Sequence, residues 1–321
     1  MLKVKFVDYP KSPLKEITLD ILKEKFGDVE ESDTPDFLFY SAFGYEHLKY
    51  DCVKICWLGE NLQPDFNICD YAIGFSYMEF EDRYCRIPLY YFYLEDYEKA
   101  RRKHLFSKSE ICEKKFCNFV YSNSLGSSKR EEFYDLLSQY KTVDSGGKFK
   151  NNIGGPIEDK YLFQKDYKFS IAFENSSTSG YTTEKILQAF SARTIPIYWG
   201  NPNVERDFNK KAFINCHQYE NFEEVIEIIK KIDQDDELFE QYLREPIGNE
   251  QQFPNDALKK YKEFLIKICS QNPEKAIRRN NVYWGERYQK EQRMLRFPVK
   301  VTLKKRCLRY IKKMFKRIVN P

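Results

Sequence analysis

The residues with the clearest chemical potential lie between positions 168 and 208. An apolar strand-like run ends at Glu174 and leads through a hydroxyl-rich segment into a helix-like pattern that starts near Thr182. The N–H groups at the start of such a helix point out of the carboxyl end of the strand and can bind an anion. Thr182 or Thr183 can cap this helix, whereas Lys185 lies in its first turn, where the dipole disfavours a cation. A bound pyrophosphate would compensate for that charge.

A second segment, residues 194 to 203, follows this helix and predicts a strand that ends in a turn at Gly200. Parallel strands bring their carboxyl ends to one edge of a sheet, where open α/β sheets bind ligands. Taken alone, Glu184 and Lys185 are equally well explained as solvated helix residues. The two segments together favour a site for a nucleotide sugar.

These segments resemble the α1,3/α1,4-fucosyltransferases of glycosyltransferase family 10, and its bacterial branch more closely than its animal members. The resemblance extends over roughly residues 55 to 250. It rests on residues 71–75, 82–84, 88–91, 143–147, 173–175, 180–185, 195–200, 207–209 and 213–215. It implies a GT-B architecture, an α/β fold in which two Rossmann-like domains face each other across a cleft and the second domain holds GDP-fucose.

The resemblance also implies roles for residues of the second domain. By motif position, Asn175, Tyr181 and Lys185 are implied to contact the diphosphate or the sugar. Glu184 is implied to contact the ribose, and an ionised carboxylate is a suitable acceptor for sugar hydroxyls.

Arg130, in a helix-like pattern after the strand expected at 116 to 122, matches the diphosphate arginine of the family. Its neighbour Lys129 is a rival for that role. Without the resemblance, Arg130 is better explained as a surface charge that pairs with Glu131 or Glu132.

Transfer with inversion requires a base that takes the proton of the acceptor hydroxyl, on the face opposite the leaving diphosphate. A strand expected at 53 to 58 is followed by Gly59 and Glu60, and in the family the glutamate after this glycine is the proposed base. Glu60 is therefore the catalytic candidate, and an ordinary turn residue is the alternative. Glu79 and Asp82 are competing carboxylates, although we expect Asp82 to form a structural pair with Arg83.

Strand-like and helix-like patterns alternate along the chain, which predicts parallel sheets with helical crossovers. We expect an acceptor-binding domain over residues 1–111 and a GDP-fucose-binding domain over 112–272. Residues 273–299 are expected to form a helical segment that packs back on the first domain, and residues 300–321 a basic amphipathic helix.

Composition narrows the possible partners. The net charge is +4, but the last 22 residues carry nine basic residues and no carboxylate, so the body of the chain is mildly acidic. This argues against nucleic-acid binding by the body of the chain and predicts that the tail docks on an anionic membrane surface; nucleic-acid binding would rest on the basic tail alone. Packing of the tail on the enzyme or on a partner is the alternative. The start of the chain does not resemble a secretory signal, and no apolar run is long enough to cross a bilayer.

Nine cysteines without a C-x-x-C pair and three histidines predict no zinc site and suit a reducing compartment. The carboxylates at 233–237 are expected to cap helices, so we predict no required metal and no cofactor, with a divalent ion at most stimulatory. We expect a cytoplasmic protein on the inner face of the cytoplasmic membrane.

The sequence thus predicts an inverting α1,3-fucosyltransferase that moves L-fucose from GDP-β-L-fucose to the 3-OH, or in some cases the 4-OH, of N-acetylglucosamine in a lactosamine-type glycan. The products would be Lewis-type structures of a lipopolysaccharide or capsule. Two alternatives remain at this stage: a GT-B transferase with another GDP-sugar or acceptor, because the loop at 176–179 departs from several bacterial members, and a non-catalytic, membrane-associated glycan-binding protein.

Overall fold

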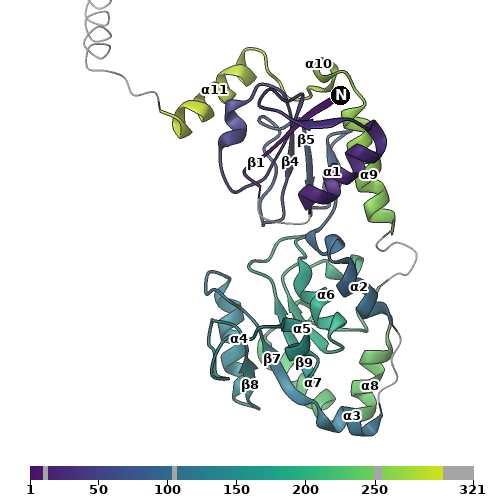
Figure 1. Ribbon diagram of the computed structural model, residues 1–321. Helices are drawn as coiled ribbons and strands as arrows, with labels where there is room; N and C mark the ends of the chain where they lie inside the picture. The colour runs from purple at the N-terminus through teal and green to yellow at the C-terminus, as the bar shows by residue number, and fades with distance from the viewer. Residues whose placement is uncertain (10–13, 103–106, 249–254, 299–321) are drawn as a thin grey trace, which may run out of the picture.

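The computed structural model describes residues 1–9, 14–102, 107–248 and 255–298. The chain forms two α/β domains, one above the other in Figure 1, and each is built on a parallel sheet. This confirms the expected fold class. The helix expected at 300–321 lies outside the described residues.

The first domain contains a six-stranded parallel sheet with the order β2-β1-β3-β4-β5-β6. Its central strand β4 is buried along its whole length, as expected of a parallel strand with helices on both faces of the sheet. The strands are β1 (Leu2–Val7), β2 (Val29–Glu31), β3 (Phe37–Tyr40), β4 (Val53–Trp57), β5 (Tyr71–Gly74) and β6 (Tyr84–Arg86).

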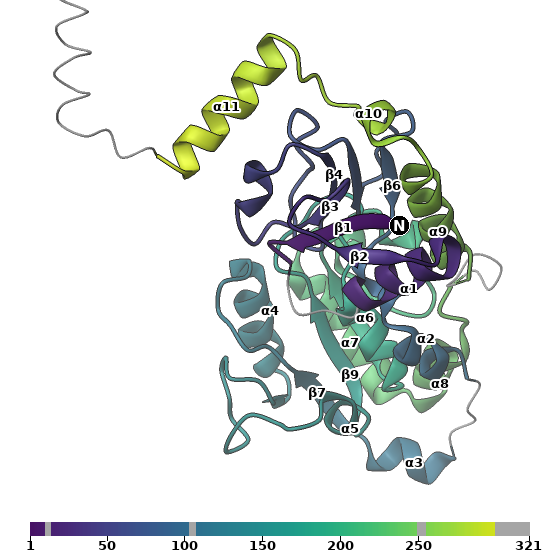
Figure 2. The same ribbon diagram turned by 45° about the horizontal axis from the view of Figure 1, so that its top comes forward.

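Helix α9 (Asn255–Cys269) belongs to the first domain, although we expected residues 112–272 to form the second. It lies beside α1 (Leu14–Phe26) in both Figure 1 and Figure 2, and the hydroxyls of Thr18 and Tyr261 are 2.6 Å apart. Tyr261 and Leu265 are part of the core under the first sheet. The apolar face of α9 is therefore buried against a sheet that was completed more than 150 residues earlier in the chain.

The second domain contains a five-stranded parallel sheet with the order β11-β10-β9-β7-β8. The strands are β7 (Lys115–Phe119), β8 (Val143–Ser145), β9 (Tyr167–Phe173), β10 (Ile195–Trp199) and β11 (Ile214–Asn215). The helices of this part are α3 (Lys108–Glu113), α4 (Ser128–Ser138), α5 (Lys160–Gln164), α6 (Glu184–Ser191), α7 (Phe222–Gln234) and α8 (Asp236–Arg244), with short 3-10 turns η3 (Val204–Arg206) and η4 (Cys216–Gln218).

Helix α2 (Leu94–Arg101) follows the 3-10 turn η2 (Leu89–Phe92) and packs on the second domain, although it was expected within the first domain at 1–111. The Ser191 hydroxyl on α6 donates to Asp96 (2.9 Å), and Tyr97 joins a buried cluster with Phe190. Helix α9, from the range expected to form the second domain, therefore packs on the first, and α2, from the range expected to form the first domain, packs on the second. Both helices bury apolar residues at these positions, Tyr261 and Leu265 of α9 in the first domain and Tyr97 of α2 in the second.

The segment after α9 lies on the first domain. Asp70 accepts the backbone N–H groups of Arg278 (2.8 Å) and Arg279 (3.0 Å), and its carboxylate forms a fully buried ion pair with the Arg279 guanidinium. These bonds fix the chain between α10 (Pro273–Ala276) and α11 (Trp284–Arg296), and α11 contacts the 3-10 turn η1 (Glu46–Lys49). Within the described ranges, no helix combines the length and apolarity needed to cross a bilayer.

Candidate functional site

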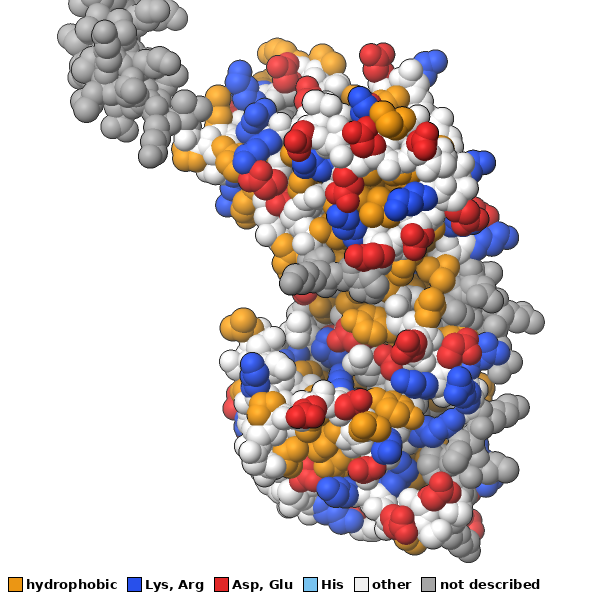
Figure 3. Space-filling model, viewed as in Figure 1, with side chains coloured by type: hydrophobic (Ala, Val, Ile, Leu, Met, Phe, Trp, Pro, Cys, Tyr) orange, Lys and Arg blue, Asp and Glu red, His pale blue; other side chains and the backbone are white. Residues whose placement is uncertain are grey.

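The candidate residues gather where the carboxyl ends of the two sheets approach each other. The turns after β4 and β5 contact the loop between β9 and α6 and the turn after β10. The space-filling view in Figure 3 shows the surface indented between the two domains at this level. Both halves of the predicted site therefore lie at one place in the molecule.

Glu174 organises the second-domain side, immediately after β9, and is fully buried. Its carboxylate accepts the backbone N–H and the hydroxyl of Thr183 (2.7 Å each) and forms an ion pair with Lys185 Nζ (3.1 Å). Thr183 is the N-cap residue of α6 by position, but its hydroxyl is committed to Glu174 and caps no N–H of the helix. The expectation that Thr182 or Thr183 caps α6 through its side chain was wrong.

The positive charge of Lys185 is compensated by two carboxylates of the protein, those of Glu174 and Glu184. Burial lowers its pKa, but the carboxylates of Glu174 and Glu184 outweigh burial and hold the pKa above its usual range. Burial conversely raises the pKa of Glu184, and the charges of Lys185 and Lys160 outweigh this effect and lower it. The position of Lys185 in the first turn therefore does not require a bound pyrophosphate, contrary to our expectation. Its role as a donor contact stays a prediction.

Arg130, in the first turn of α4, is only 2% exposed. Its guanidinium stacks on the ring of Tyr121 at 4.0 Å and donates one hydrogen bond to Asn175 Oδ1 (2.7 Å). Its Nε has no partner among the described residues. A buried cation without a counter-charge is costly, and an anion bound beside Asn175 would offset that cost.

The two alternatives for Arg130, a surface ion pair with Glu131 or Glu132 and replacement by Lys129 as the diphosphate cation, do not agree with the contacts in the structure. Glu131 pairs with Lys150 and Glu132 pairs with Lys129, so neither forms the surface ion pair considered for Arg130. Lys129 itself is exposed and forms an ion pair with Glu132. Arg130, rather than Lys129, is the cation placed beside the loop after β9.

Tyr181 and Gly180 form the end of this loop. Tyr181 is 2% exposed, and burial together with the charge of Glu174 raises the pKa of its hydroxyl. The charge of Glu60 makes a smaller contribution in the same direction. Gly180 has φ +88°, and a Cβ there would lie 2.5 Å from the carbonyl oxygen of Phe75. The backbones of the two domains are thus in contact at a position that only glycine can occupy.

Glu60 lies in the turn after β4 and is exposed. A Cβ at the preceding Gly59 would lie 2.6 Å from the Trp57 ring, so a larger residue there would require that ring to shift. Glu60 follows this glycine directly at the carboxyl end of β4, which ends at Trp57. The turn predicted from the sequence is therefore present, while the role of Glu60 as base stays a prediction.

Asp82 forms an ion pair, but with a different partner from the one expected. Its carboxylate accepts two hydrogen bonds from the Arg278 guanidinium (2.9 and 3.2 Å). Arg83 is instead buried and donates to the backbone carbonyls of Phe66, Cys69 and Asp70. Asp82 is thus committed to the segment after α10, which leaves Glu79 as the exposed competitor of Glu60.

Three of the carboxylates at 233–237 have structural partners, those of Asp233, Asp235 and Asp236. Asp235 caps α8 by accepting the N–H groups of Glu237 and Leu238, as expected of a helix start, and Asp233 is buried against Lys141. In the described part of the chain, no group of three or more His, Cys, Asp or Glu side chains is arranged to hold a metal ion.

Five residues of the site were assigned no role from the sequence: Asn61, Tyr77, Arg86, Asn201 and Asp207, although Asp207 lies in a segment that carries the family resemblance. All five make hydrogen bonds at the junction of the domains. Asn61 and Asn201 directly follow residues that we had singled out, Glu60 and Gly200, so their position in a strand-end turn was the available signal. The pairing of Arg86 with Asp207 had no signal in the sequence, because the two residues are 121 positions apart.

Comparisons with known proteins match both domains. The family model described as the Alpha-(1,3)-fucosyltransferase FucT N-terminal domain matches residues 4–93. The model described as Glycosyltransferase family 10 (fucosyltransferase) C-term matches residues 111–281. The two models together span nearly all of the described chain.

Individual relatives agree with these models. The Alpha-(1,3)-fucosyltransferase FucT of Helicobacter pylori is 37% identical over 229 residues, which are 61% of this chain and 48% of that protein. This chain thus spans about half the length of that relative. A crystal structure of an α1,3-fucosyltransferase has a TM-score of 0.75 at 29% identity, with 88% of this chain and 93% of that chain covered. A crystal structure with GDP-fucose has a TM-score of 0.68 at 28% identity, with coverage of 82% and 90%.

Proposed function

We propose, because the chain belongs to glycosyltransferase family 10 and has its GT-B fold, that it is an inverting α1,3-fucosyltransferase with GDP-β-L-fucose as donor. The observation that supports this most directly is the buried guanidinium of Arg130, beside Asn175 and without a carboxylate partner in the described residues. An anionic leaving group at that place would supply the missing counter-charge.

The second domain would hold the donor. Arg130 and Lys185, with the N-terminal N–H groups of α6, would stabilise the negative charge that develops on the departing diphosphate. Glu184, ionised at neutral pH, would accept the ribose hydroxyls. Asn175 and Tyr181 would contact the diphosphate or the fucose. Glu174 keeps this arrangement in place by bonding to both Thr183 and Lys185.

The first domain would supply the base. Glu60 would take the proton of the acceptor hydroxyl while that oxygen attacks C1 of fucose and the bond from C1 to the diphosphate breaks on the opposite face. Inversion at C1 converts the β-linked donor into an α-linked product. We propose no required metal, since the cations of the protein would carry the charge stabilisation. Full activity in the presence of EDTA would support this assignment, and its loss with restoration by a divalent ion would contradict it.

We propose a lactosamine-type glycan as acceptor, with fucose joined to the 3-OH, or in some cases the 4-OH, of N-acetylglucosamine to give Lewis-type structures. The test is incubation with GDP-fucose and a panel of type 1 and type 2 disaccharides, with the linkage of each product determined. A 3-linked product supports the proposal. Transfer to none of the acceptors, or transfer from GDP-mannose in preference to GDP-fucose, would contradict it.

We also propose that the basic tail, outside the described residues, docks the enzyme on an anionic membrane surface from the cytoplasm. The tail is rich in lysine and arginine and has apolar residues at helical spacing. Sedimentation with anionic liposomes should be lost when residues 300–321 are deleted, while transfer to a soluble disaccharide is kept. Unchanged sedimentation of the shortened chain would contradict the membrane role.

A further inference from the structure

The loop at 176–182, between β9 and α6, is contacted by the first domain at both of its ends. Near its start, Asn61 Nδ2 donates to Ser176 Oγ (2.5 Å) and to Thr178 Oγ1 (2.8 Å). Near its end, Tyr181 meets the ring of Phe75 edge-on at 5.0 Å. The position of the loop therefore depends on the first domain as well as on its own.

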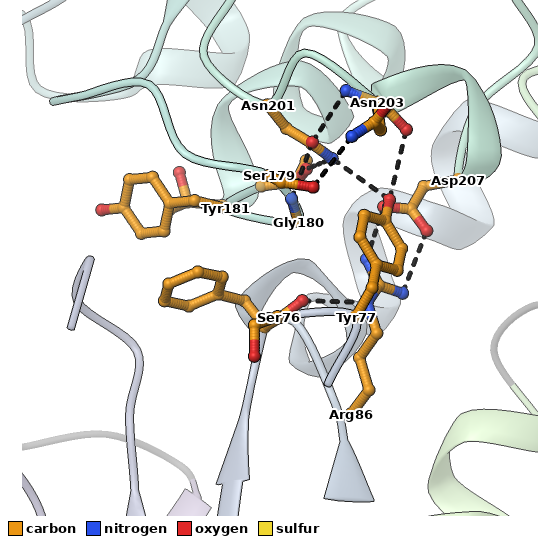
Figure 4. A network of polar contacts seen from close by, with 12 residues as sticks. Ser76, Tyr77, Arg86, Ser179, Gly180, Tyr181, Asn201, Asn203 and Asp207 are labelled. Atoms are coloured by element: carbon orange, nitrogen blue, oxygen red, sulfur yellow. Dashed lines mark hydrogen bonds and ion pairs between the residues drawn. The ribbon is translucent and has the colours of Figure 1, made fainter. Parts of the chain in front are cut away.

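A polar junction lies next to the second of these contacts (Figure 4). Arg86 on β6 forms two hydrogen bonds with the Asp207 carboxylate (2.7 and 3.1 Å) and a third with the carbonyl of Phe75 (2.9 Å). The ring of Tyr77 lies between the guanidinium groups of Arg86 (4.1 Å) and Arg206 (4.0 Å). The Asp207 side chain is 5% exposed, so water screens this ion pair between domains only weakly.

Asn201 connects the junction to the loop. Its fully buried amide donates to the hydroxyls of Tyr77 (3.3 Å) and Thr182 (3.1 Å), and its carbonyl accepts the N–H of Gly180 (2.7 Å). Asn203 adds a hydrogen bond to Ser179 (2.8 Å). Residues 179, 180 and 182 are thus bonded to two asparagines that contact the first domain through Tyr77.

We infer that Asn61 and Tyr77 are positioning residues, which hold the 176–182 loop in register with the base-bearing turn of the first domain. The inference rests on the proposed function. Asn61 directly follows Glu60, so one residue joins the proposed base to the loop that would contact fucose. A misplacement of about 1 Å between reacting groups can lower a rate by about 10²-fold. Neither residue contacts Arg130 or Lys185, the two cations proposed to bind the diphosphate, so we expect the affinity for GDP to change much less than turnover.

The test compares Asn61→Ala and Tyr77→Phe with Asn67→Ala, an exposed residue of the same domain whose side chain, among the described residues, bonds only to Asp65 of its own turn. We expect kcat for fucose transfer to fall about tenfold or more in Asn61→Ala and less in Tyr77→Phe, with Kd for GDP within twofold of the parent and no change in Asn67→Ala. An unchanged kcat in both variants, or a Kd for GDP that weakens in parallel with kcat, would overturn the inference.

Hydrogen exchange gives a readout that does not need fucosyltransferase activity. Amide exchange in the peptide that contains residues 176–182 should become faster in Asn61→Ala and Tyr77→Phe, and should stay as in the parent in Asn67→Ala. If the parent transfers no fucose but exchange responds in this way, the proposed function fails, and the positioning of the loop by Asn61 and Tyr77 is still supported. If transfer is normal in all variants and exchange is unchanged, the proposed function is supported, and the inferred positioning role of Asn61 and Tyr77 is wrong.

Discussion

The donor side of the site is buried and internally bonded, whereas the acceptor side is open. Glu174 and Arg130 are 0% and 2% exposed and are held by hydrogen bonds to neighbouring loops. Glu60 is exposed, and none of the described residues bonds to its carboxylate. Changes on the donor side should therefore alter stability and nucleotide binding together, while changes at Glu60 should alter turnover alone.

The largest effect is expected for Glu60→Gln. Loss of a general base typically lowers kcat by about 10²–10⁴-fold, and an exposed side chain contributes little to stability. The variant should therefore keep the thermal midpoint of the parent. Glu79→Gln, at the exposed competing carboxylate, is the matched control and should retain parental kcat. Near-parental turnover of Glu60→Gln would show that the base lies elsewhere.

Glu174→Gln should show the opposite pattern. It leaves Lys185 buried beside a neutral side chain, and breaking a buried pair typically costs about 3–5 kcal/mol. We expect the lower end of that range because Lys185 keeps Glu184 as a second partner. Urea denaturation measures the loss. Glu184→Gln, which leaves Glu174 in place, should cost less, and an equal or smaller loss in Glu174→Gln would contradict the central role given to this carboxylate.

The smallest expected effect is a dependence of stability on pH, which we assign to two histidines of the described residues, one in each domain. Burial lowers the pKa of His47 in the first domain, more than Asp8 raises it, and burial also lowers the pKa of His217 in the second. Since both folded-state values lie below the ordinary 6.5, the unfolded chain binds protons first on acidification. The free energy of unfolding is therefore unaffected by the two histidines well above pH 6.5, and it falls as the pH drops below 6.5.

Denaturation midpoints at about pH 7.5 and about pH 5.5 test this dependence. The parent should be less stable at the lower pH, and His47→Gln and His217→Gln should each reduce the difference. A midpoint difference that neither substitution changes would assign the pH dependence to other groups. If one substitution alone removes the difference, the pH dependence of stability arises in the domain that contains that histidine.

Local sequence patterns predicted the strands and turns well, because a residue's tendency to form a strand or a turn depends mainly on its neighbours. The strand expected at 168 to 174 is observed at Tyr167–Phe173, and the turn at Gly59 is where it was expected. The position of α9 could not be predicted in the same way. Its pattern identifies an apolar face, but not the sheet on which that face packs.

Side-chain pairing was the other limit. Asp82 is adjacent to Arg83 in sequence, but pairs with Arg278, which is 196 positions away. Lys185 appeared to need a phosphate until the structure placed Glu174 beside it. Arg130 was expected from family resemblance, and its burial against Tyr121 distinguishes it from Lys129 in a way that spacing alone did not. Such contacts depend on the fold of the whole chain.

Calorimetric titration with GDP tests the division between the two sides most directly. The parent and Glu60→Gln should bind GDP with the same micromolar Kd, whereas Arg130→Met should bind at least about tenfold more weakly, because a charge-assisted hydrogen bond contributes about 1.5–3 kcal/mol. Parental affinity in Arg130→Met, or weakened binding in Glu60→Gln, would contradict the assignment of the donor to the second domain and of the base to the first.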